Sequence, residues 1–344
     1  MTHQLTGRWW LESAATIAAA AILCALLIAI LRPLLARYAL ARPNARSSHT
    51  TPTPQGGGIA VIAATIATTL FAIYFFSAGM PAPSGPLVAL FAATIFIGFV
   101  GAADDIRPIA VAPRLLLQAL AVMAVIYALP TDMRVVPLLP WWIERALLRA
   151  GGLWLVNLVN FMDGLDWMTV AEVVPITVTL ALIGAFGYLP PQHTAIALSL
   201  CGGMIGFAYF NRPVAKLFLG DVGSLPIGLL LGWLLLLLAA NGHLAAAILM
   251  PLYYLADATI TLLRRLFRGE PVWHAHRSHF YQLATDRGFT VVGVVASVFA
   301  VNVGLCALAL LIVIWPNRTV EIAALATGTL LVACELVAFS RGRK

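Results

Sequence analysis

Long apolar segments dominate the chain and predict membrane-spanning helices. Most are close to the roughly 20 residues that a helix needs to cross a bilayer. Eleven such runs cover residues 13–31, 57–79, 86–103, 113–130, 150–168, 170–189, 193–210, 224–240, 243–263, 291–314 and 320–339. The fifth run is the weakest, because it is short and ends in Asn and Asp residues. We expect an all-α, polytopic helical membrane protein with about 10–11 transmembrane helices in one domain, residues 1–344.

Composition excludes the soluble alternatives. The 344 residues are 61% hydrophobic and only 10% charged, with a mean hydropathy of +0.94, whereas soluble proteins carry about 25% charged residues. The first apolar run lacks a small-residue cleavage site, so we expect a retained helix and not a signal peptide. The four cysteines lie inside apolar runs, without the spacing of metal ligands or a disulfide framework.

Charge is distributed unevenly between alternate loops. Of the 21 Lys and Arg residues, 16 fall in the segments 32–56, 104–114, 211–223, 264–289 and 340–344. The positive-inside rule predicts that these segments are cytoplasmic, with a periplasmic N-terminus and a cytoplasmic C-terminus. The net charge of +7 does not indicate nucleic-acid binding, because there is no Lys/Arg-rich block with interleaved aromatic residues.

Acidic and amide side chains gather on the same predicted side. The adjacent carboxylates of Asp104 and Asp105 repel each other, so they indicate a metal, a base or a counter-charge, although a solvated helix end is the simpler alternative. Asn157, Asn160 and Gly164 stand three or four positions apart, so the polar groups can line one face of the fifth span, where helix–helix hydrogen bonding is the alternative. That alternative does not easily explain the carboxylates of Asp163 and Asp166 in the same segment.

Three further segments carry glycine turns or histidines. The glycines of segments 53–58 and 220–224 allow close backbone approach to an anion or a cation, or simply tight helix packing. The segment 274–279, His-Ala-His-Arg-Ser-His, could bind zinc or an anion. Zinc would need further ligands nearby, and none is close in sequence, so we interpret this loop as a phosphate or sugar contact. The scattered carboxylates suit magnesium, which shares oxygen ligands with phosphates.

These segments, in this order, resemble the motifs of the polyprenyl-phosphate N-acetylhexosamine-1-phosphate transferases. The matching motifs lie between about residues 40 and 290: Thr-Pro-x-Gly-Gly-Gly at 53–58, Asp104-Asp105, Asn-x-x-Asn-x-x-Asp-Gly-x-Asp at 157–166, Gly-Asp-x-Gly-Ser at 220–224 and His-x-His at 274–276. The resemblance implies transfer of a sugar 1-phosphate from a UDP-sugar to undecaprenyl phosphate, with release of UMP. It also implies the bacterial inner membrane, an active site facing the cytoplasm, and magnesium with manganese able to replace it; a homodimer is compatible with it.

The resemblance assigns roles by position. Asp104, Asp105 and Asp221 are the expected catalytic residues, and Asp221 and Asn160 are the expected metal ligands. The expected substrate-binding residues are His49, Asn157, Asp163, Asp166, His274, His276 and Arg277.

Departures from the family pattern favour the branch that initiates O-antigen of lipopolysaccharide. The family usually has a glycine where this chain has Trp167, and the peptidoglycan branch has adjacent histidines where this chain has the interrupted 274–279 segment. That branch, the phospho-N-acetylmuramoyl-pentapeptide transferases, is the first alternative. An ion-coupled transporter is the second; it predicts polar residues across the whole membrane depth, and no pair of discontinuous half-helices stands out. A non-enzymatic scaffold would leave the acidic segments unexplained.

Overall fold

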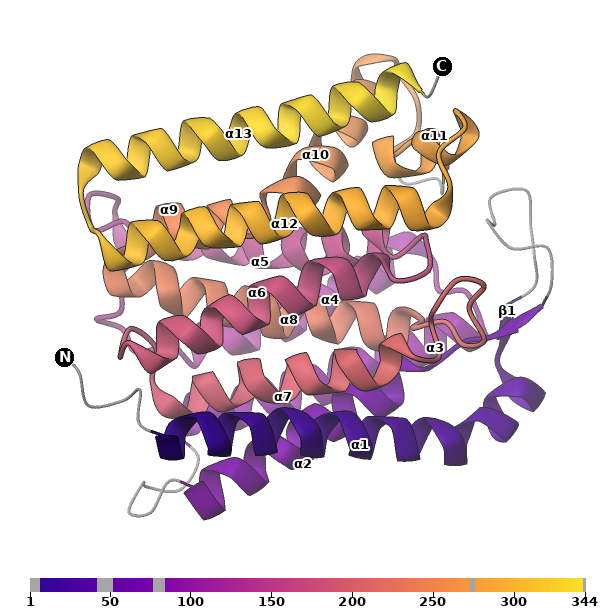
Figure 1. Cartoon of the computed structure of the whole chain (residues 1–344), viewed down its shortest axis with the longest axis horizontal. Coiled ribbons are helices and arrows are strands. Elements are labelled where there is room, and N and C mark those ends of the chain that lie inside the picture. The colour runs from indigo at the N-terminus through magenta and orange to yellow at the C-terminus, as the bar shows by residue number, and fades with distance from the viewer. Residues whose placement is uncertain (1–6, 42–51, 77–83, 273–275, 343–344) are drawn as a thin grey trace.

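The computed structural model describes residues 7–41, 52–76, 84–272 and 276–342, and these form a bundle of helices whose axes mostly run in one direction (Figure 1). The helices are α1 (Gly7–Tyr38), α2 (Gly58–Phe76), α3 (Gly85–Ile106), α4 (Val111–Tyr127), α5 (Trp141–Met162), α6 (Met168–Ala185), α7 (Pro191–Ala208), α8 (Asp221–Leu238), the π-helical turn η1 (Ala239–His243), α9 (Leu244–Leu249), α10 (Leu252–Phe267), α11 (Phe280–Asp286), α12 (Val291–Ile314) and α13 (Arg318–Arg341). A short antiparallel ladder joins β1 (Leu40–Ala41) to β2 (Thr53–Pro54). His49 and His274 lie outside the described residues.

The helices confirm the all-α membrane architecture predicted from the apolar runs. In the described part of the chain, seven helices are long and apolar enough to cross a membrane: α1, α2, α3, α6, the segment Asp221–Leu249, α12 and α13. The helix α4 is a shorter apolar helix. The predicted span 243–263 is divided between α9 and α10, because the α-helix is interrupted at Met250 and Pro251.

The fifth span differs most from its prediction. The apolar run predicts residues 150–168, whereas α5 begins at Trp141 and ends at Met162. The earlier start contains Glu144, which is buried, pairs with Arg134 and accepts hydrogen bonds from the backbone N–H groups of Val135 (2.6 Å) and Val136 (2.7 Å). A charge whose partners are supplied by the preceding loop is tolerated inside the bundle. Because the apolar run excludes charged residues, it begins at residue 150, whereas the helix begins at Trp141.

The helix α8 lies at the centre of the bundle and packs closely against α3. A methyl group in place of the hydrogen at Gly101 of α3 would lie 2.3 Å from the carbonyl oxygen of Asp221. Only glycine allows this approach, which is a common way for membrane helices to pack when small residues meet. The close contact brings the last turn of α3 against the first turn of α8.

The glycine segment before α2 serves packing in the same way. The N–H groups of Gly56 and Gly57 donate to the carbonyl of Phe218, and Gly58 donates to that of Leu219. A methyl group at Gly58 would lie 2.1 Å from the Cα of Gly223. The two glycine motifs therefore bind each other, which agrees with the tight-packing alternative.

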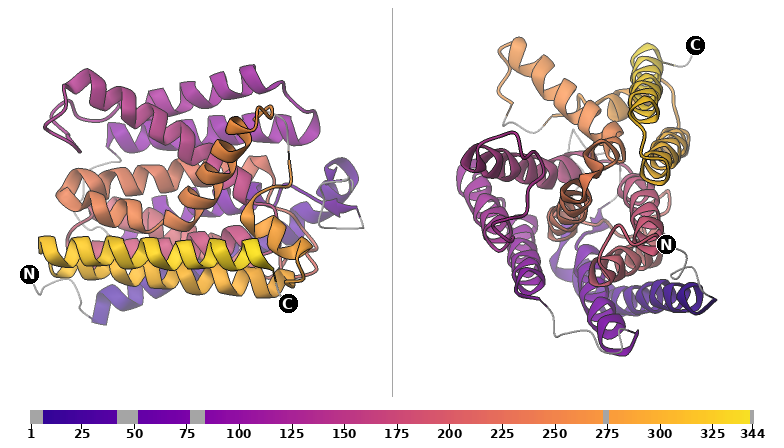
Figure 2. Two further views of the ribbon diagram at one scale, coloured as in Figure 1. Left: turned by 90° about the horizontal axis from the view of Figure 1, so that it is seen from above. Right: turned by 90° about the vertical axis from the view of Figure 1, so that its left-hand side faces the viewer.

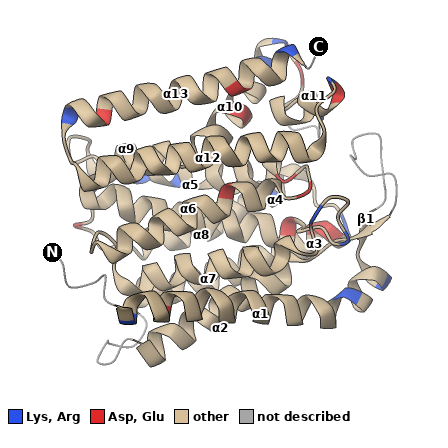
Figure 3. Cartoon of the chain, in the orientation of Figure 1, with Lys and Arg blue, Asp and Glu red and all other residues tan. Residues whose placement is uncertain are grey.

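The two described ends of the chain lie at opposite ends of the bundle. Figure 1 places the start of α1 at the left and the end of α13 at the right, and the right-hand view in Figure 2 shows α13 apart from α1. The end that holds β1, α11 and the C-terminus also carries most of the coloured acidic residues and many of the basic ones in Figure 3. We call this the site end of the bundle.

Candidate active site

The three aspartates predicted as catalytic meet at the site end. Asp104 and Asp105 occupy the last turn of α3, Asp221 is the first residue of α8, and Asn160 lies in the last turn of α5. We call these four residues the carboxylate cluster. The close packing of α3 on α8 explains how side chains more than a hundred positions apart come into contact.

Asp105 caps the N-terminus of α8. Its carboxylate accepts hydrogen bonds from the backbone N–H groups of Asp221 (3.0 Å) and Val222 (3.1 Å). A helix leaves these N–H groups unpaired at its start, and a negative charge there interacts favourably with the helix dipole. The backbone carbonyl of Asp105 accepts a further bond from the side chain of Gln55 (2.9 Å). Asp105 therefore joins α3, α8 and the loop before α2.

Asp104 faces Asp221 across Arg114, a residue that the sequence motifs did not select. Arg114 donates to Asp104 at 2.6 Å and lies 3.9 Å from the Asp221 carboxylate. The backbone N–H of Ile109 also donates to Asp104 (2.6 Å). Arg114 belongs to the first turn of α4, so the turn between α3 and α4 supplies the counter-charge of the acid pair. In the sequence, only its position ten residues after Asp104 could have indicated that Arg114 is the counter-charge.

Asn160 contacts the predicted metal ligand directly. Its amide nitrogen donates to the carboxylate of Asp221 (2.7 Å) and to the hydroxyl of Ser224 (2.9 Å). This contact joins the end of α5 to the start of α8. The sequence correctly grouped Asn160 with Asp221, although the two belong to motifs far apart in the chain.

The turn between α5 and α6 carries two further predicted site residues with different surroundings. Asp163 accepts a hydrogen bond from the hydroxyl of Thr169. Burial raises the pKa of Asp163 to about 7; the Thr169 hydrogen bond opposes this shift, and the charges of Asp105 and Asp166 add to it. Asp166 is buried and accepts from the backbone N–H of Ala215 (2.9 Å). Asp166 therefore fixes the loop that leads to α8.

Trp167 adopts a backbone conformation that favours glycine. Its φ of 66° is the only positive φ at a non-glycine residue in the described part of the chain. Two hydrogen bonds hold it there: its backbone N–H donates to the side chain of Asn211 (2.7 Å), and its indole N–H donates to the carbonyl of Ala208 (2.6 Å). Trp167 thus adopts a left-handed conformation that glycine would adopt without strain, at a conformational cost of about 1–2 kcal/mol.

Asn157 lies about one helical turn before Asn160 and binds a neighbouring helix. It is buried, and its amide donates to the side chain of Gln118 in α4 (2.8 Å) and to the carbonyl of Leu153 (2.9 Å). The helix–helix contact is therefore present in the structure, and a role of Asn157 in substrate binding stays a prediction. Helical spacing predicts that Asn157 and Asn160 share one face of α5. Along that face, Asn160 lies at the site end and Asn157 lies one turn deeper in the bundle.

The buried carboxylate of Asp257 anchors the histidine segment. It accepts from the backbone N–H groups of Phe280 (3.0 Å) and Tyr281 (3.1 Å), which begin α11, and it contacts the Nδ1 of His279 at 3.2 Å. The hydroxyls of Tyr253 (3.2 Å) and Thr261 (3.3 Å) also donate to it. The sequence left the role of Asp257 open, because three of its five partners come from a segment more than 20 positions later.

The described part of the histidine segment is held by its own neighbours. The Nδ1 of His276 lies 2.8 Å from the hydroxyl of Ser278. The guanidinium of Arg277 pairs with Asp286 (3.1 Å) and donates to Thr285 (3.2 Å), both in α11. The roles of His276 and Arg277 in substrate binding remain predictions.

The donor chemistry of the carboxylate cluster suits a hard divalent cation. The carboxylates of Asp104 and Asp221 are close enough to interact directly, and Arg114 is the cation between them. Two such groups repel unless a proton or a cation compensates them. Among the described residues, no three His, Cys, Asp or Glu side chains form a metal-binding group. Carboxylate and amide oxygens fit a cation that keeps water or phosphate oxygens as further ligands.

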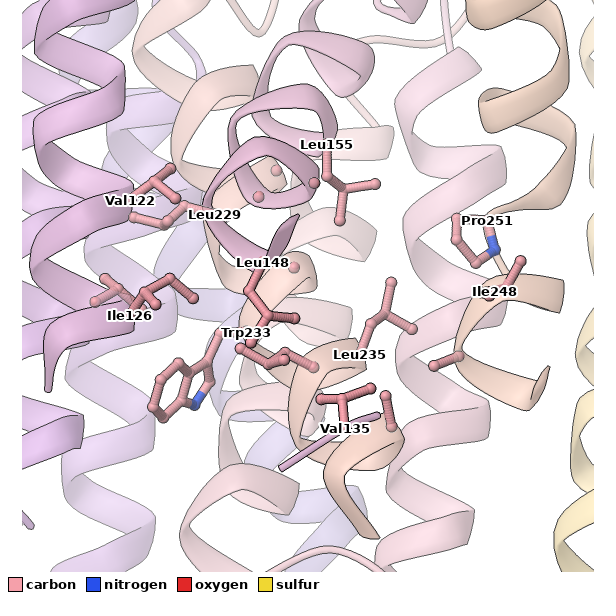
Figure 4. Close-up of a pocket in the computed structure, with 18 of the residues that line it drawn as sticks. Val122, Ile126, Val135, Leu148, Leu155, Leu229, Trp233, Leu235, Ile248 and Pro251 are labelled. Atoms are coloured by element: carbon pink, nitrogen blue, oxygen red, sulfur yellow. The ribbon is translucent and has the colours of Figure 1, made fainter. Parts of the chain in front are cut away.

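An apolar cavity lies along the same two helices that carry Asn160 and Asp221. It has a volume of about 220 Å³ and is lined by apolar residues of α4, α5, α8, α9 and α10, such as Leu155, Leu229 and Trp233 (Figure 4). The lining begins at Gly228 in α8, seven positions after Asp221 and so about 10 Å farther along the helix axis. The cavity therefore lies from the middle of the bundle toward the end opposite the site end, where Val135 and Ala239 line it.

Sequence comparison relates the chain to a family of membrane transferases. Residues 87–239 match the profile of glycosyl transferase family 4. The chain is 26% identical over 280 residues to the "Probable undecaprenyl-phosphate N-acetylglucosaminyl 1-phosphate transferase" of Bacillus subtilis (strain 168), covering 77% of this chain and 76% of the relative. It is also 26% identical over 280 residues to the phospho-N-acetylmuramoyl-pentapeptide-transferase of Clostridium beijerinckii, covering 74% and 80%. The Streptococcus uberis enzyme of the same name is 29% identical over 258 residues, covering 65% and 74%.

Proposed function

Because the chain belongs to the superfamily of polyprenyl-phosphate N-acetylhexosamine-1-phosphate transferases, we propose that it transfers an N-acetylhexosamine 1-phosphate from a UDP-sugar to undecaprenyl phosphate. UMP leaves, and the product primes a lipid-linked surface polysaccharide of the O-antigen type. The observation that carries the proposal is the carboxylate cluster above an apolar cavity on the same pair of helices. This arrangement provides for a charged phosphate and a hydrocarbon chain in one substrate.

The reaction joins two anions, so its main obstacle is charge repulsion. A phosphomonoester has a second pKa near about 6 and is largely dianionic at neutral pH. One of its oxygens forms a bond to the sugar-bearing phosphorus of the UDP-sugar. The bond from that phosphorus to the bridging oxygen breaks, and the electron pair leaves with UMP. The protein therefore needs to position and neutralise charge more than it needs to create a nucleophile.

Asp104 and Arg114 are suited to receive the lipid phosphate. Arg114 can turn from Asp104 toward a phosphate oxygen, because guanidinium groups bind carboxylates and phosphates in similar ways. Asp104, held between Arg114 and the backbone of Ile109, accepts the remaining proton of a monoanionic phosphate. Asp105 differs in its role, because its bonds to the start of α8 position Asp221.

Asp221, with Asn160 beside it, would hold magnesium, and Asp104 is near enough to share it. Bound there, magnesium supplies positive charge to the diphosphate and to the leaving UMP; manganese offers the same chemistry. Asp221 sits at the end of α8 with its carboxylate partly exposed, whereas the Asp105 carboxylate is engaged with backbone N–H groups. This difference supports Asp221 as the principal ligand.

The nucleotide and the sugar would lie between the 163–169 turn and the histidine segment. In that turn, the carboxylate of Asp163 accepts a hydrogen bond from the hydroxyl of Thr169. Its other oxygen would be available to the nucleotide or the sugar. His276 and Arg277 would reach the diphosphate from the opposite side. Arg277 must then leave its ion pair with Asp286, which is half-exposed and easily exchanged.

The first part of the polyprenyl chain would occupy the apolar cavity. With the lipid phosphate at Asp104 and Asp221, the cavity begins about 10 Å deeper along α8, which a few isoprene units span. The rest of the chain would extend into the surrounding bilayer, since exposed apolar side chains cover the outside of the bundle.

We place the site end of the bundle in the cytoplasm and the N-terminus in the periplasm of a bacterial inner membrane. The support is the concentration of Lys and Arg in alternate loops and the location of the two termini at opposite ends of the bundle. UDP-sugars are then supplied from the cytoplasm.

A muramoyl-pentapeptide transferase is the second candidate, since two of the relatives described above carry that name. The two candidates share the acceptor and UMP release and differ only in the donor. The experiment is to measure UMP release by the purified protein with undecaprenyl phosphate and a panel of donors: UDP-N-acetylglucosamine, its 6-deoxy N-acetylamino relatives and UDP-N-acetylmuramoyl-pentapeptide. Release with a simple UDP-N-acetylhexosamine supports the proposal. Release only with the pentapeptide donor would replace it by the second candidate.

A further inference from the structure

A basic cavity lies beside the last turns of α10. It has a volume of about 250 Å³ and is lined by seven residues: Thr261, Arg264, Arg265, Arg268, Ser278, Leu283 and Arg287. Four of the seven are arginines, and none of these described lining residues is acidic. We call it the arginine cavity. It shares no residue with the carboxylate cluster or the apolar cavity.

Three helices converge on the arginine cavity. Thr261, Arg264, Arg265 and Arg268 are spaced three, four and seven positions apart, so they lie along one face of α10. Arg287, just after α11, donates to the carbonyl of Ser340 at the end of α13. The cavity is therefore built into the fold at the junction of α10, α11 and α13, and Figure 3 shows blue residues near the C-terminus in this part of the site end.

Positive charge at the arginine cavity exceeds the negative charge that its described partners supply. Arg265 pairs with Glu270 at 2.8 Å, and the Arg264 guanidinium lies 5.3 Å from the centre of the Phe280 ring. Asp257 accepts from the lining residue Thr261 but is engaged by five donors, so Glu270 and Asp257 together balance two of the four charges at most. Several guanidinium groups around one cavity repel each other unless an anion binds between them. Phosphate is the anion whose oxygens match the guanidinium fork.

The outer face of α10 at the same level is apolar and exposed. Leu263, Leu266 and Phe267 are exposed, Phe267 to 84%. Arginines beside exposed apolar residues at the end of a membrane helix are typical of the headgroup level of a bilayer. A ligand at this place would therefore meet guanidinium groups on one side and hydrocarbon on the other.

We propose that the arginine cavity binds the phosphate of an anionic phospholipid headgroup, whose acyl chains lie against the exposed face of α10. The arginine cavity borders the proposed nucleotide site, because its lining residue Ser278 bonds to His276, but Arg264 and Arg268 have no part in the proposed transfer reaction. A bound lipid would connect α10 with α11 and so stabilise the segment that carries the histidines.

Lipid titration of the full-length, delipidated protein in a neutral detergent tests the proposal. Phosphatidylglycerol, phosphatidylcholine and inorganic phosphate are added separately, and the apparent affinity is taken from native mass spectrometry and from the melting temperature. Phosphatidylglycerol should bind and raise the melting temperature by about 2–4 °C, whereas phosphatidylcholine and inorganic phosphate at the same concentration should not.

The double variant Arg264→Gln/Arg268→Gln should bind phosphatidylglycerol about 10- to 30-fold more weakly, since each basic residue near a lipid surface contributes a roughly fivefold gain in affinity. The matched control is Arg32→Gln/Arg37→Gln, which removes the same charge from the exposed end of α1 and should bind like the wild type. Equal binding by the Arg264/Arg268 variant and the control would overturn the proposal. So would an equal effect of inorganic phosphate, or a loss of UDP binding in the Arg264/Arg268 variant, which would assign the cavity to the nucleotide.

Discussion

Asp104 and Asp105 are neighbours in sequence, yet their side chains have different partners. Asp105 binds two backbone N–H groups at the start of α8, while Asp104 pairs with Arg114 and faces Asp221. An adjacent acid pair in a sequence suggests a shared role. The geometry instead divides the pair into one residue that positions α8 and one that faces the proposed substrate.

Asparagine substitution separates these two roles. Asp105→Asn should lower the free energy of unfolding by about 1–2 kcal/mol, because it removes a charged helix cap, with a smaller effect on turnover. Asp104→Asn should reduce kcat about a hundredfold or more, with less effect on stability, because it also removes repulsion between Asp104 and Asp221. Thermal unfolding in detergent and UMP release measure the two effects. An Asp105→Asn protein that is stable but inactive would show that Asp105 takes part in the chemistry.

Trp167 offers a second test at this scale. Trp167→Ala and Trp167→Gly both lose the indole contacts and its bond to Ala208, but only glycine adopts the φ of 66° without strain. We expect both variants to be less stable than the wild type, and Trp167→Gly to be more stable than Trp167→Ala by about 1 kcal/mol. Unfolding curves of the two variants in one detergent give the difference. Equal stabilities would mean that the turn relaxes when the indole is removed.

At the scale of helices, seven of the eleven apolar runs coincide with described helices that are long and apolar enough to cross a membrane, because a bilayer crossing imposes a length and excludes unpaired charge. The start of α5 and the break between α9 and α10 were missed. The first depends on partners that the preceding loop gives to Glu144, and the second on where the chain must turn around its neighbours.

The motifs likewise identified the members of the carboxylate cluster but not their partners. A run such as Gly-Asp-x-Gly-Ser stands out in a sequence, whereas a single Arg114 or Asp257 gives no local pattern. These residues act through contacts with elements that only the folded chain brings near. For the same reason, the sequence could not separate Asn157, which joins two helices, from Asn160, which reaches the site.

Asp257 connects two elements, α10 and α11, and its substitution should loosen the segment between them. Asp257→Asn keeps the shape but leaves at least two of its five donors without an acceptor, which should cost about 2–4 kcal/mol. Trypsin should then cleave after Arg277 faster than in the wild type. Asp286→Asn removes only a half-exposed ion pair and serves as the control. Unchanged cleavage and stability in Asp257→Asn would contradict the anchoring role.

At the scale of the whole molecule, the bundle separates two kinds of surface. The site end gathers the acidic cluster, the histidine segment and the arginine cavity, while the outside along the helices is largely apolar. A membrane around the bundle would leave that end in water on one side. The proposed reaction requires this side to be the cytoplasm, where nucleotide sugars are made.

Cysteine labelling tests the orientation. In a variant without the four native cysteines, single cysteines at Thr6 and Ser340 should react with a membrane-impermeant maleimide from opposite sides, Thr6 from the periplasm and Ser340 from the cytoplasm. Labelling of both positions from the same side would show that the number of spans is even and would remove one predicted crossing.

The central claim is that phosphate travels with the sugar, and the position of a radioactive phosphate tests it most directly. The purified protein is incubated with undecaprenyl phosphate, magnesium and a UDP-N-acetylhexosamine labelled with ³²P in the phosphate next to the sugar. We predict that the label enters the lipid fraction as a diphosphate-linked sugar while unlabelled UMP is released, and that Asp221→Asn loses this transfer whereas Asp132→Asn, the same change at an exposed loop, retains it. Label that stays in the aqueous phase as UDP while sugar enters the lipid, or full transfer by Asp221→Asn, would contradict the account.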